Sequence, residues 1–383
     1  MGNWVTGIPT PHYPSTPITR MVNMSVKATD KFVRSLSYLI LTVIGVTMLA
    51  PLAWMVTTSL KEPGEVFQTP PKWIPTEQIF VRKGDRYLKV AWLPMKGKKV
   101  RVERLLERGH NTEVRLMDGS SQGEVMTVRR KLLVPAERLS IHWDNYSHAW
   151  KAFPVDEAFF GLLNNVDGFL VWYLNSLIVA VTITFGQLLT SSLAAYAFAR
   201  LKFPLKDKLF LGYLGTMMVP GVVTMIPVFI LLKYLDAWTG IPWRNTYKAL
   251  ILPGMFSAYG TFMLRQFFMT IPTELEDAAK IDGCGKLGVY RNVILPLSKP
   301  ALATLATIVF MGSWNDFMWP LIVTDSTGMK TLPVGLAFFQ GQYNTDWAML
   351  MAASLIVMLP VLLVFIFNQR FFVRGIVLSG LKA

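Results

Sequence analysis

The sequence contains little that could form a covalent cross-link or a metal centre. Its 383 residues include one cysteine, Cys284, which excludes an intrachain disulfide and a cysteine-rich metal site. The four histidines, His12, His110, His142 and His148, show no metal-ligand spacing. We therefore expect loop histidines and no bound metal in this chain.

Motifs for covalent catalysis and for nucleotide binding are also missing. The sequence shows no Ser-His-Asp or Cys-His constellation. The stretch Gly283-Cys284-Gly285-Lys286 has some likeness to a phosphate-binding loop. However, Leu287 stands where such a loop requires Ser or Thr, and Lys280 stands where it requires its first glycine. We therefore predict that the chain is not an enzyme and holds no cofactor of its own.

Charged residues are scarce, whereas long apolar runs are frequent. Charged residues make up 16% of the chain, hydrophobic residues make up 52%, and the mean hydropathy is +0.39. These values are outside the usual range of soluble globular proteins. Apolar runs of membrane-spanning length cover residues 35–59, 171–197, 208–232, 247–269, 300–323 and 347–369. The sequence thus predicts an all-α integral membrane protein with about six transmembrane helices.

The distribution of Lys and Arg predicts the orientation of these spans. Sixteen basic residues flank the spans on one side, and the short loops opposite hold only Lys233, Arg244, Lys248 and Lys330. The positive-inside rule then places both termini in the cytoplasm. The net charge of +14 could also form a nucleic-acid-binding face, but the charges are scattered over separate loops. We expect a multi-pass membrane protein that contacts anionic lipid and no nucleic acid.

The long segment between the first two spans has a different composition. Residues 60–168 are expected outside the cytoplasm, with a β-rich insertion at about 78–140. Apolar side chains alternate there with charged ones, and a turn is expected after Asp118. The alternating positions are Val100 with Val102, Val114 with Leu116, and either Val125 with Thr127 or Met126 with Val128. This pattern predicts a small antiparallel sheet, for which a compact β-barrel of about 60 residues is a suitable form.

The remaining domain boundaries follow from the spans. Residues 1–34 are expected to form a cytoplasmic tail, because they contain four prolines and no sustained helical period. Residues 35–59 form the first span, residues 169–370 a core of five helices, and residues 371–383 a second cytoplasmic tail.

A polar segment at 272–298 separates two apolar spans of the core. Pro272 and Thr273 can start a helix, and Glu276 and Asp277 place acidic side chains near its positive end. Gly283 allows a turn, and a second short helix is expected from 286 to 295. The segment therefore predicts a helix-turn-helix whose small residues suit docking into the cleft of a partner.

This segment resembles the cytoplasmic coupling loop of importer permeases of the ATP-binding-cassette class. The residues that carry the resemblance are Asp277, Ala278, Ala279, Gly283, Val293, Leu295 and Pro296, with Asp277 and Val293 standing where Glu and Ile are usual. Residues 173–176, 194–197, 218–220, 314–317 and 369–375 are similar to the carbohydrate-uptake branch of that class. Within it, the chain looks most like the second permease of the maltose type, over residues 30–60 and from 145 onward.

The resemblance implies a permease subunit of a binding-protein-dependent sugar importer driven by ATP, located in the cytoplasmic (inner) membrane of a prokaryote. Implied partners are a second permease subunit, two ATP-binding subunits that hold ATP and Mg, an extracytoplasmic solute-binding protein and the sugar. The implied ATPase-docking residues are Glu276, Asp277, Ala278, Ala279, Asp282 and Gly283. The β-rich insertion would dock the solute-binding protein or the partner permease, or would only stabilise the external face.

Two other functions remain open at this point. An ATP-independent secondary transporter would show inverted repeats or paired ionisable residues at the bilayer midplane, and we find no such repeat. A membrane-anchored scaffold would need only the β-rich insertion.

Polar residues within the predicted spans are candidates for a substrate path. They are Asn175, Gln187, Asn315 and Asp316, and Trp314 lies beside the last two. Amides and carboxylates bind sugar hydroxyls, and aromatic faces stack on sugar rings. The alternative is hydrogen bonding between helices, or a position near the external interface where Trp and Asp are well accommodated.

Overall fold

The computed structural model describes residues 17–67, 71–83, 86–95, 98–118, 121–158, 163–340 and 345–379. The predicted turn residues 119–120 and parts of both predicted tails, 1–16 and 380–383, lie outside the described residues. The chain forms two units, Met1–Met55 and Val56–Ala383.

The first unit consists mainly of the long helix α1 (Pro17–Ser59). This helix begins well before the predicted span 35–59, so it includes much of the segment that we expected as a tail. Pro17 can occupy the first turn of a helix because its missing N–H has no helical partner there. Within α1, the segment Lys31–Ser59 is long and apolar enough to cross a membrane.

The second unit begins with short helical turns and strands. They are η1 (Pro63–Glu65), β1 (Thr76–Gln78), β2 (Phe80–Lys83), β3 (Arg86–Met95), β4 (Lys98–Arg108), β5 (Asn111–Leu116), β6 (Val125–Arg129), η2 (Arg130–Leu132), β7 (Val134–Pro135), β8 (Glu137–Leu139), α2 (Asp144–Lys151), β9 (Pro154–Ala158) and β10 (Leu163–Asp167).

The predicted antiparallel sheet is confirmed. Strands β2 to β6 pair in sequence order, with β7 on β3, and β1 pairs separately with β8. Val102, Val114 and Leu116 are buried in its core, and Met126 and Val128 pack against them. Val125 is 50% exposed, so Met126 with Val128 is the correct one of the two alternations that the sequence allowed.

The described strands do not form the closed β-barrel that the sequence suggested. The hydrogen-bonded path ends at β2 and at β6, and no described strand joins these two ends. The chain returns from β6 through η2, and the next strand, β7, has two residues and pairs with β3. Because β7 pairs with β3 and not with β6, it does not connect the two ends of the path.

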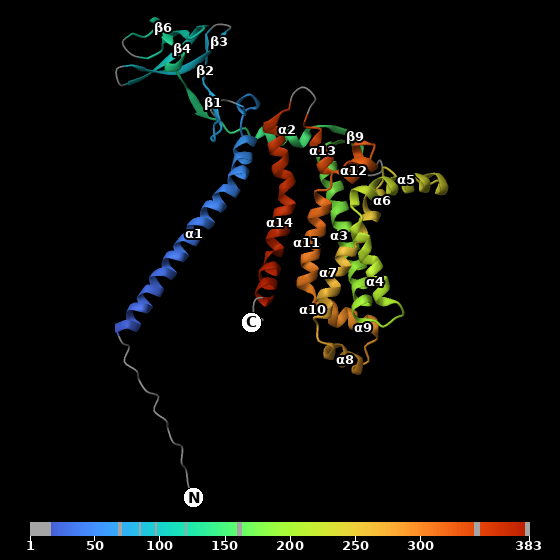
Figure 1. Ribbon diagram of the computed structural model, residues 1–383. Helices are drawn as coiled ribbons and strands as arrows, with labels where there is room; N and C mark the ends of the chain where they lie inside the picture. The colour runs from blue at the N-terminus through green and yellow to red at the C-terminus, as the bar shows by residue number, and fades with distance from the viewer. Residues whose placement is uncertain are drawn as a thin grey trace. The chain divides into compact units, whose positions relative to one another are not determined.

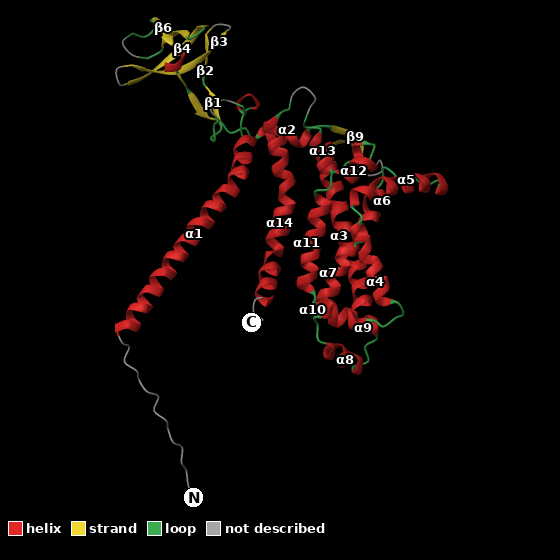
Figure 2. Ribbon diagram, viewed as in Figure 1, coloured by secondary structure: helices red, strands yellow, loops and turns green. Residues whose placement is uncertain are grey.

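The rest of the second unit is almost entirely helical (Figure 2). Its elements are α3 (Gly168–Arg200), α4 (Lys206–Gly215), η3 (Thr216–Met218), α5 (Gly221–Thr239), α6 (Tyr247–Ile251), η4 (Leu252–Met255), α7 (Ala258–Met269), α8 (Thr273–Ile281), α9 (Lys286–Val289), the π-helical turn η5 (Tyr290–Ile294), α10 (Leu295–Leu297), α11 (Lys299–Trp314), α12 (Met318–Val323), η6 (Thr327–Met329), α13 (Leu332–Ala337) and α14 (Trp347–Ser379).

Three of the six predicted spans are interrupted. The run 208–232 breaks before Pro220, the run 247–269 breaks around η4, and the run 300–323 breaks after Trp314. Proline explains the first two breaks, because it lacks an N–H and disfavours helix at the preceding residue. By length and composition alone, the described helices provide four spans, or up to five if a pair bent by 78° at Ser298 counts as one.

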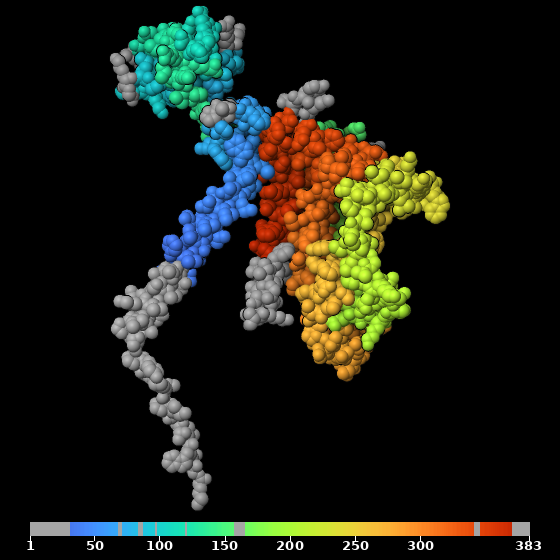
Figure 3. Space-filling model, viewed as in Figure 1, coloured from blue at the N-terminus to red at the C-terminus, as the bar shows by residue number. Residues whose placement is uncertain are grey.

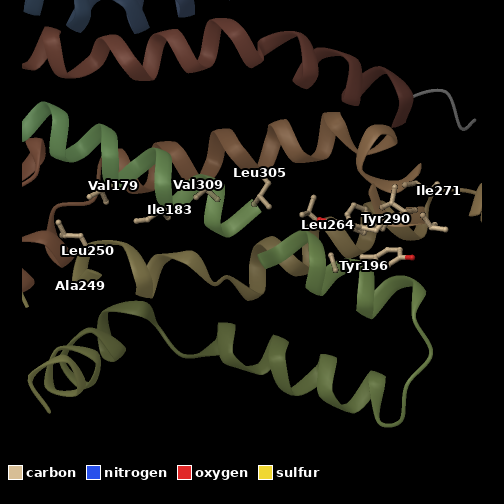
Figure 4. Packing of buried hydrophobic residues seen from close by; sticks show 14 of the residues in the cluster. Val179, Ile183, Tyr196, Ala249, Leu250, Leu264, Ile271, Tyr290, Leu305 and Val309 are labelled. Atoms are coloured by element: carbon tan, nitrogen blue, oxygen red, sulfur yellow. The ribbon is translucent and has the colours of Figure 1, made fainter. Parts of the chain in front are cut away.

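Helix α3 lies in the centre of the helical part. It contacts α7 and α11, and buried side chains of these three helices form the larger core cluster together with others from α5, α6, α9, η5 and α12 (Figure 4). Gly260 of α7 permits this close packing, since an added Cβ would lie 2.7 Å from the Ser191 hydroxyl of α3. A second cluster, around Trp172 and Trp314, joins α3 to α11, α13 and α14.

Candidate functional site

The segment from α8 to α10 lies at one end of the helical part, opposite α2, α12 and α13 (Figure 1). Figure 3 shows it as the orange surface at that end. Pro272 precedes α8, and Glu274 and Glu276 occupy its first turn as predicted. Gly283 has a φ of +88°, a conformation that glycine adopts without strain. The predicted helix-turn-helix is thus confirmed, although its second half contains the π-helical turn η5.

Backbone hydrogen bonds close the turn after α8. The N–H groups of Asp282, Gly283 and Cys284 donate to carbonyls in the last turn of the helix, at 3.0, 3.0 and 2.9 Å. These bonds satisfy carbonyls that the end of a helix otherwise leaves without partners. The turn is therefore well defined by its own backbone.

Most of the predicted docking residues lie on the surface of the second unit. Asp277, Ala278, Asp282 and Gly283 are exposed, and Ala279 is half-buried. Two apolar side chains that the sequence analysis did not select flank the turn: Ile281 is 87% exposed and Leu287 is 70% exposed. The hydrogen bond from Lys280 to Asp277 raises the pKa of Lys280, so its ammonium group stays charged at neutral pH.

Glu276 is placed differently from the other predicted docking residues. It is buried, and its Oε1 lies 2.8 Å from Nε of Arg200, the last residue of α3. Both side chains are 8% exposed. The carboxylate thus faces the helical part rather than the surface. The sequence did contain a signal for the burial of Glu276. Glu276 and Ala279 are three residues apart and therefore lie on the same face of α8, which is the inner one.

Further hydrogen bonds attach this segment to α3, and the sequence analysis did not predict them. The Tyr196 hydroxyl donates to the backbone carbonyl of Lys286 at 2.9 Å. The hydroxyls of Ser192 and Tyr290 lie 2.7 Å apart. The end of α3 therefore holds both halves of the helix-turn-helix.

A pocket of about 390 Å³ lies between α3, α5, η4, α7, α11 and α12. Its wall is mainly apolar. The polar and aromatic side chains that line it include Gln187, Tyr259, Ser313, Asp316 and Trp319. Asp316 also accepts a hydrogen bond at 3.3 Å from the backbone N–H of Trp319, in the first turn of α12. An apolar pocket with a few polar groups is the usual form of a small-molecule site.

The predicted substrate-path residues do not all meet there. Asn175 is fully buried; it donates to the carbonyls of Gly328 and Lys330 at 2.8 and 2.9 Å and accepts from the Tyr247 hydroxyl. These bonds attach α3 to the loop after α12. Asn175 therefore makes the helix-stabilising contacts that we considered as its alternative role.

Trp314 and Asn315 also bond within the chain. The Trp314 indole is fully buried and donates to the carbonyl of Val357 in α14 at 3.1 Å. Asn315 is exposed and donates to the carbonyl of Met311. Of the residues considered, Asp316 and Gln187 line the pocket. Trp319 and Tyr259 were missed, because hydropathy alone does not show which face of a span borders a cavity.

No group of three or more His, Cys, Asp or Glu side chains in the described ranges could hold a metal ion. The helical part combines long apolar helices, a pocket between them and an exposed polar helix-turn-helix at one end. These features define a polytopic membrane protein of the permease type.

Comparison with known proteins identifies the family. Residues 170–377 match the family described as binding-protein-dependent transport system inner membrane component, and the chain belongs to this family. It is 38% identical over 211 residues to the arabinooligosaccharides transport system permease protein of Halalkalibacterium halodurans. This alignment covers 55% of this chain and 74% of that relative. It is also 38% identical over 250 residues to the sn-glycerol-3-phosphate transport system permease protein of Yersinia pestis. That alignment covers 64% of this chain and 82% of the relative.

A solved structure shows a similar fold. The crystal structure of a bacterial ABC transporter involved in the import of the acidic polysaccharide alginate contains a chain that is 17% identical to this one. The TM-score is 0.60, and the match covers 95% of this chain and all of that chain. The likeness concerns the fold of the chain.

Proposed function

We propose that this chain is one of two membrane subunits of an ATP-driven importer for oligosaccharides or other small polyhydroxylated solutes. The observation that carries the proposal is the exposed helix-turn-helix of α8 to α10, which hydrogen bonds attach to the end of α3. Family membership and the transport systems named for the relatives support it. The chain itself would hold no ATP or Mg; the partner ATP-binding subunits would hold both.

In this proposal, α8 docks into a cleft of an ATP-binding subunit. Asp277 and Asp282 supply charge, Ala278 and Ala279 allow close approach, and Gly283 sets the turn. The exposed apolar side chains of Ile281 and Leu287 on either side of the turn would be covered by that partner. Closure of two ATP-binding subunits would displace α8 and open the central cavity alternately to each side of the membrane.

The proposed topology keeps six spans. The pairs α4 with α5, α6 with α7, and α11 with α12 would each form one interrupted span, since non-helical backbone is tolerated at membrane depth where protein or a cavity surrounds it. Both termini and α8 would then be cytoplasmic. Residues 60–168 would lie outside the cytoplasm, followed by the core 169–370 and the tail 371–383. The sheet would dock a solute-binding protein or the partner permease, or would stabilise the external face.

The first test is to solubilise native membranes gently, recover the tagged chain, and measure both its partners and its ATPase activity. We expect an ATPase and a second permease in the complex, with hydrolysis stimulated by an extracytoplasmic solute-binding protein. If the chain purified alone and moved solute across liposomes without ATP, the proposal would be wrong. An ATP-independent secondary transporter would then replace it.

The pocket allows a prediction about substrate contact. We propose that the Asp316 carboxylate binds solute hydroxyls, because it lines this mainly apolar pocket together with Trp319. Asp316→Asn keeps a side-chain oxygen that can accept from the Trp319 N–H but removes the charge. Losing a charged hydrogen bond of about 1.5–3 kcal/mol should raise the KM of uptake roughly tenfold or more.

Uptake of radiolabelled solute by the reconstituted complex would measure this KM. Asn315→Ala is the matched control, because Asn315 is exposed, its amide donates to the Met311 carbonyl, and it is not among the described residues that line the pocket. An unchanged KM in Asp316→Asn would place the solute elsewhere in the complex.

A further inference from the structure

Arg200 connects three segments that lie far apart in the sequence. It is the last residue of α3, and its Nε lies 2.8 Å from the Glu276 carboxylate of α8. Its Nη2 donates to the carbonyls of Phe268 and Ile271, at the end of α7 and just after it. One guanidinium group therefore joins the ends of two core helices to α8.

The position of this contact makes it sensitive to loss of either partner. Both side chains are 8% exposed, so little water is available to replace a missing partner. Breaking a buried ion pair leaves an uncompensated charge, which is far more disruptive than loss of a surface pair. The guanidinium also has a planar set of donors that a lysine cannot reproduce. By contrast, the ion pair between Asp277 and Lys280 on the same helix is exposed.

The other main contacts of α8 lie within its own segment. Its larger contacts are with α9 and η5, and Ala279 adds apolar packing against the core. Tyr196 and Ser192 bond to the second half of the helix-turn-helix rather than to α8. The charged contact through Arg200 is therefore the principal polar attachment of α8 to α3 and α7 in the described chain.

We infer that Arg200 and Glu276 are positioning residues that transmit displacement of α8 to α3 and α7. The inference rests on the proposed function, and it gives two neighbouring acidic residues of α8 different roles: Asp277 faces the ATP-binding subunit, whereas Glu276 faces inward to Arg200. An ATP-binding subunit that moved α8 would thereby move the ends of both core helices. Without this attachment, α8 would follow the ATP-binding subunit while α3 and α7 stayed behind.

The test uses the complete transporter, reconstituted in proteoliposomes with its solute-binding protein. Glu276→Gln keeps the size of the side chain and removes its charge. We expect the ATP-binding subunits to stay bound and ATP hydrolysis to stay near the wild-type rate. Solute transported per ATP hydrolysed should fall about tenfold, within the range of roughly 5- to 150-fold typical of coupling between sites.

A matched control removes the same charge from the same helix. Glu274 is exposed and lies two residues before Glu276, so Glu274→Gln should leave transport per ATP unchanged. If Glu276→Gln also left that ratio unchanged, the inference would be overturned. Loss of the ATP-binding subunits from the Glu276→Gln complex would overturn it as well, because Glu276 would then serve docking or folding.

A second variant keeps the test decisive if Glu276→Gln does not insert. Arg200→Lys preserves the charge but cannot reach the carboxylate and both carbonyls together. We expect transport per ATP to fall about threefold while assembly is retained, and an unchanged ratio would contradict the inference. Failure of the proposed function would look different, since the wild-type complex would then show no ATP-dependent uptake.

Discussion

Replacing Gly283 by valine is expected to abolish most ATP-dependent uptake while leaving the chain inserted in the membrane. The φ of Gly283 is +88°, which a β-branched residue adopts only with strain. An added Cβ would meet nothing within 4 Å, so the cost is conformational rather than steric. This cost should be roughly 1–2 kcal/mol or more. The turn would relieve it by rearranging, which would move Ile281 and Leu287 away from the positions proposed above for docking.

Gly285 provides the matched control for this experiment. Gly285 is two residues after Gly283, and a Cβ added to it would also meet nothing within 4 Å. Its φ of −72° and ψ of 173° suit any side chain. Uptake and ATP hydrolysis should be measured for Gly283→Val and Gly285→Val in the same membranes. We expect near-normal uptake only for Gly285→Val. Normal uptake by Gly283→Val would mean that α8 to α10 is not the coupling segment.

Substitution of Gly335 by alanine is expected to destabilise the protein strongly. An added Cβ would lie 2.0 Å from Cε3 and 2.3 Å from Cδ2 of Trp172. That indole cannot withdraw easily, because it is fully buried, donates to the carbonyl of Thr327 at 2.8 Å and stacks on Phe338. Overpacking of this kind should cost about 3 kcal/mol or more.

The measurement is the apparent melting temperature of the detergent-solubilised protein, followed by size-exclusion chromatography after heating. A loss of about 3 kcal/mol corresponds to a decrease of roughly 4 °C for a chain of 383 residues, at about 2.1 cal/mol/K of unfolding entropy per residue. Gly212→Ala in α4 is the control, because an added Cβ meets nothing there and alanine favours helix. A melting temperature for Gly335→Ala equal to that of the wild type would show that α13 is not packed on Trp172 as described.

The features that the sequence predicted correctly depend on local patterns. The alternation of Val114 with Leu116 identified a strand face, and Pro272 with Gly283 identified the limits of α8. Each of these signals lies within a few residues of the element it specifies. The antiparallel sheet and the helix-turn-helix were therefore predictable from short stretches of sequence.

The features that the sequence did not predict depend on contacts between distant segments. The burial of Glu276 requires Arg200, and the role of Asn175 requires the carbonyls of Gly328 and Lys330. Hydropathy also treated each apolar run as continuous, although Trp314 ends α11 within one of them. An average over a window of apolar residues cannot locate such a break when no proline marks it.

Helix α3 runs without a break, and this affects how it can transmit movement. Of the described helices long enough to cross a membrane singly, α3 alone has no internal proline, whereas α1, α5 and α14 contain Pro51, Pro227 and Pro360. Its 33 residues form a rod of about 50 Å at roughly 1.5 Å per residue. Asn175 holds one end of this rod to the loop after α12, and Arg200 holds the other end to α8. A displacement of one end of α3 would therefore be transmitted to the other end, without bending at an internal proline.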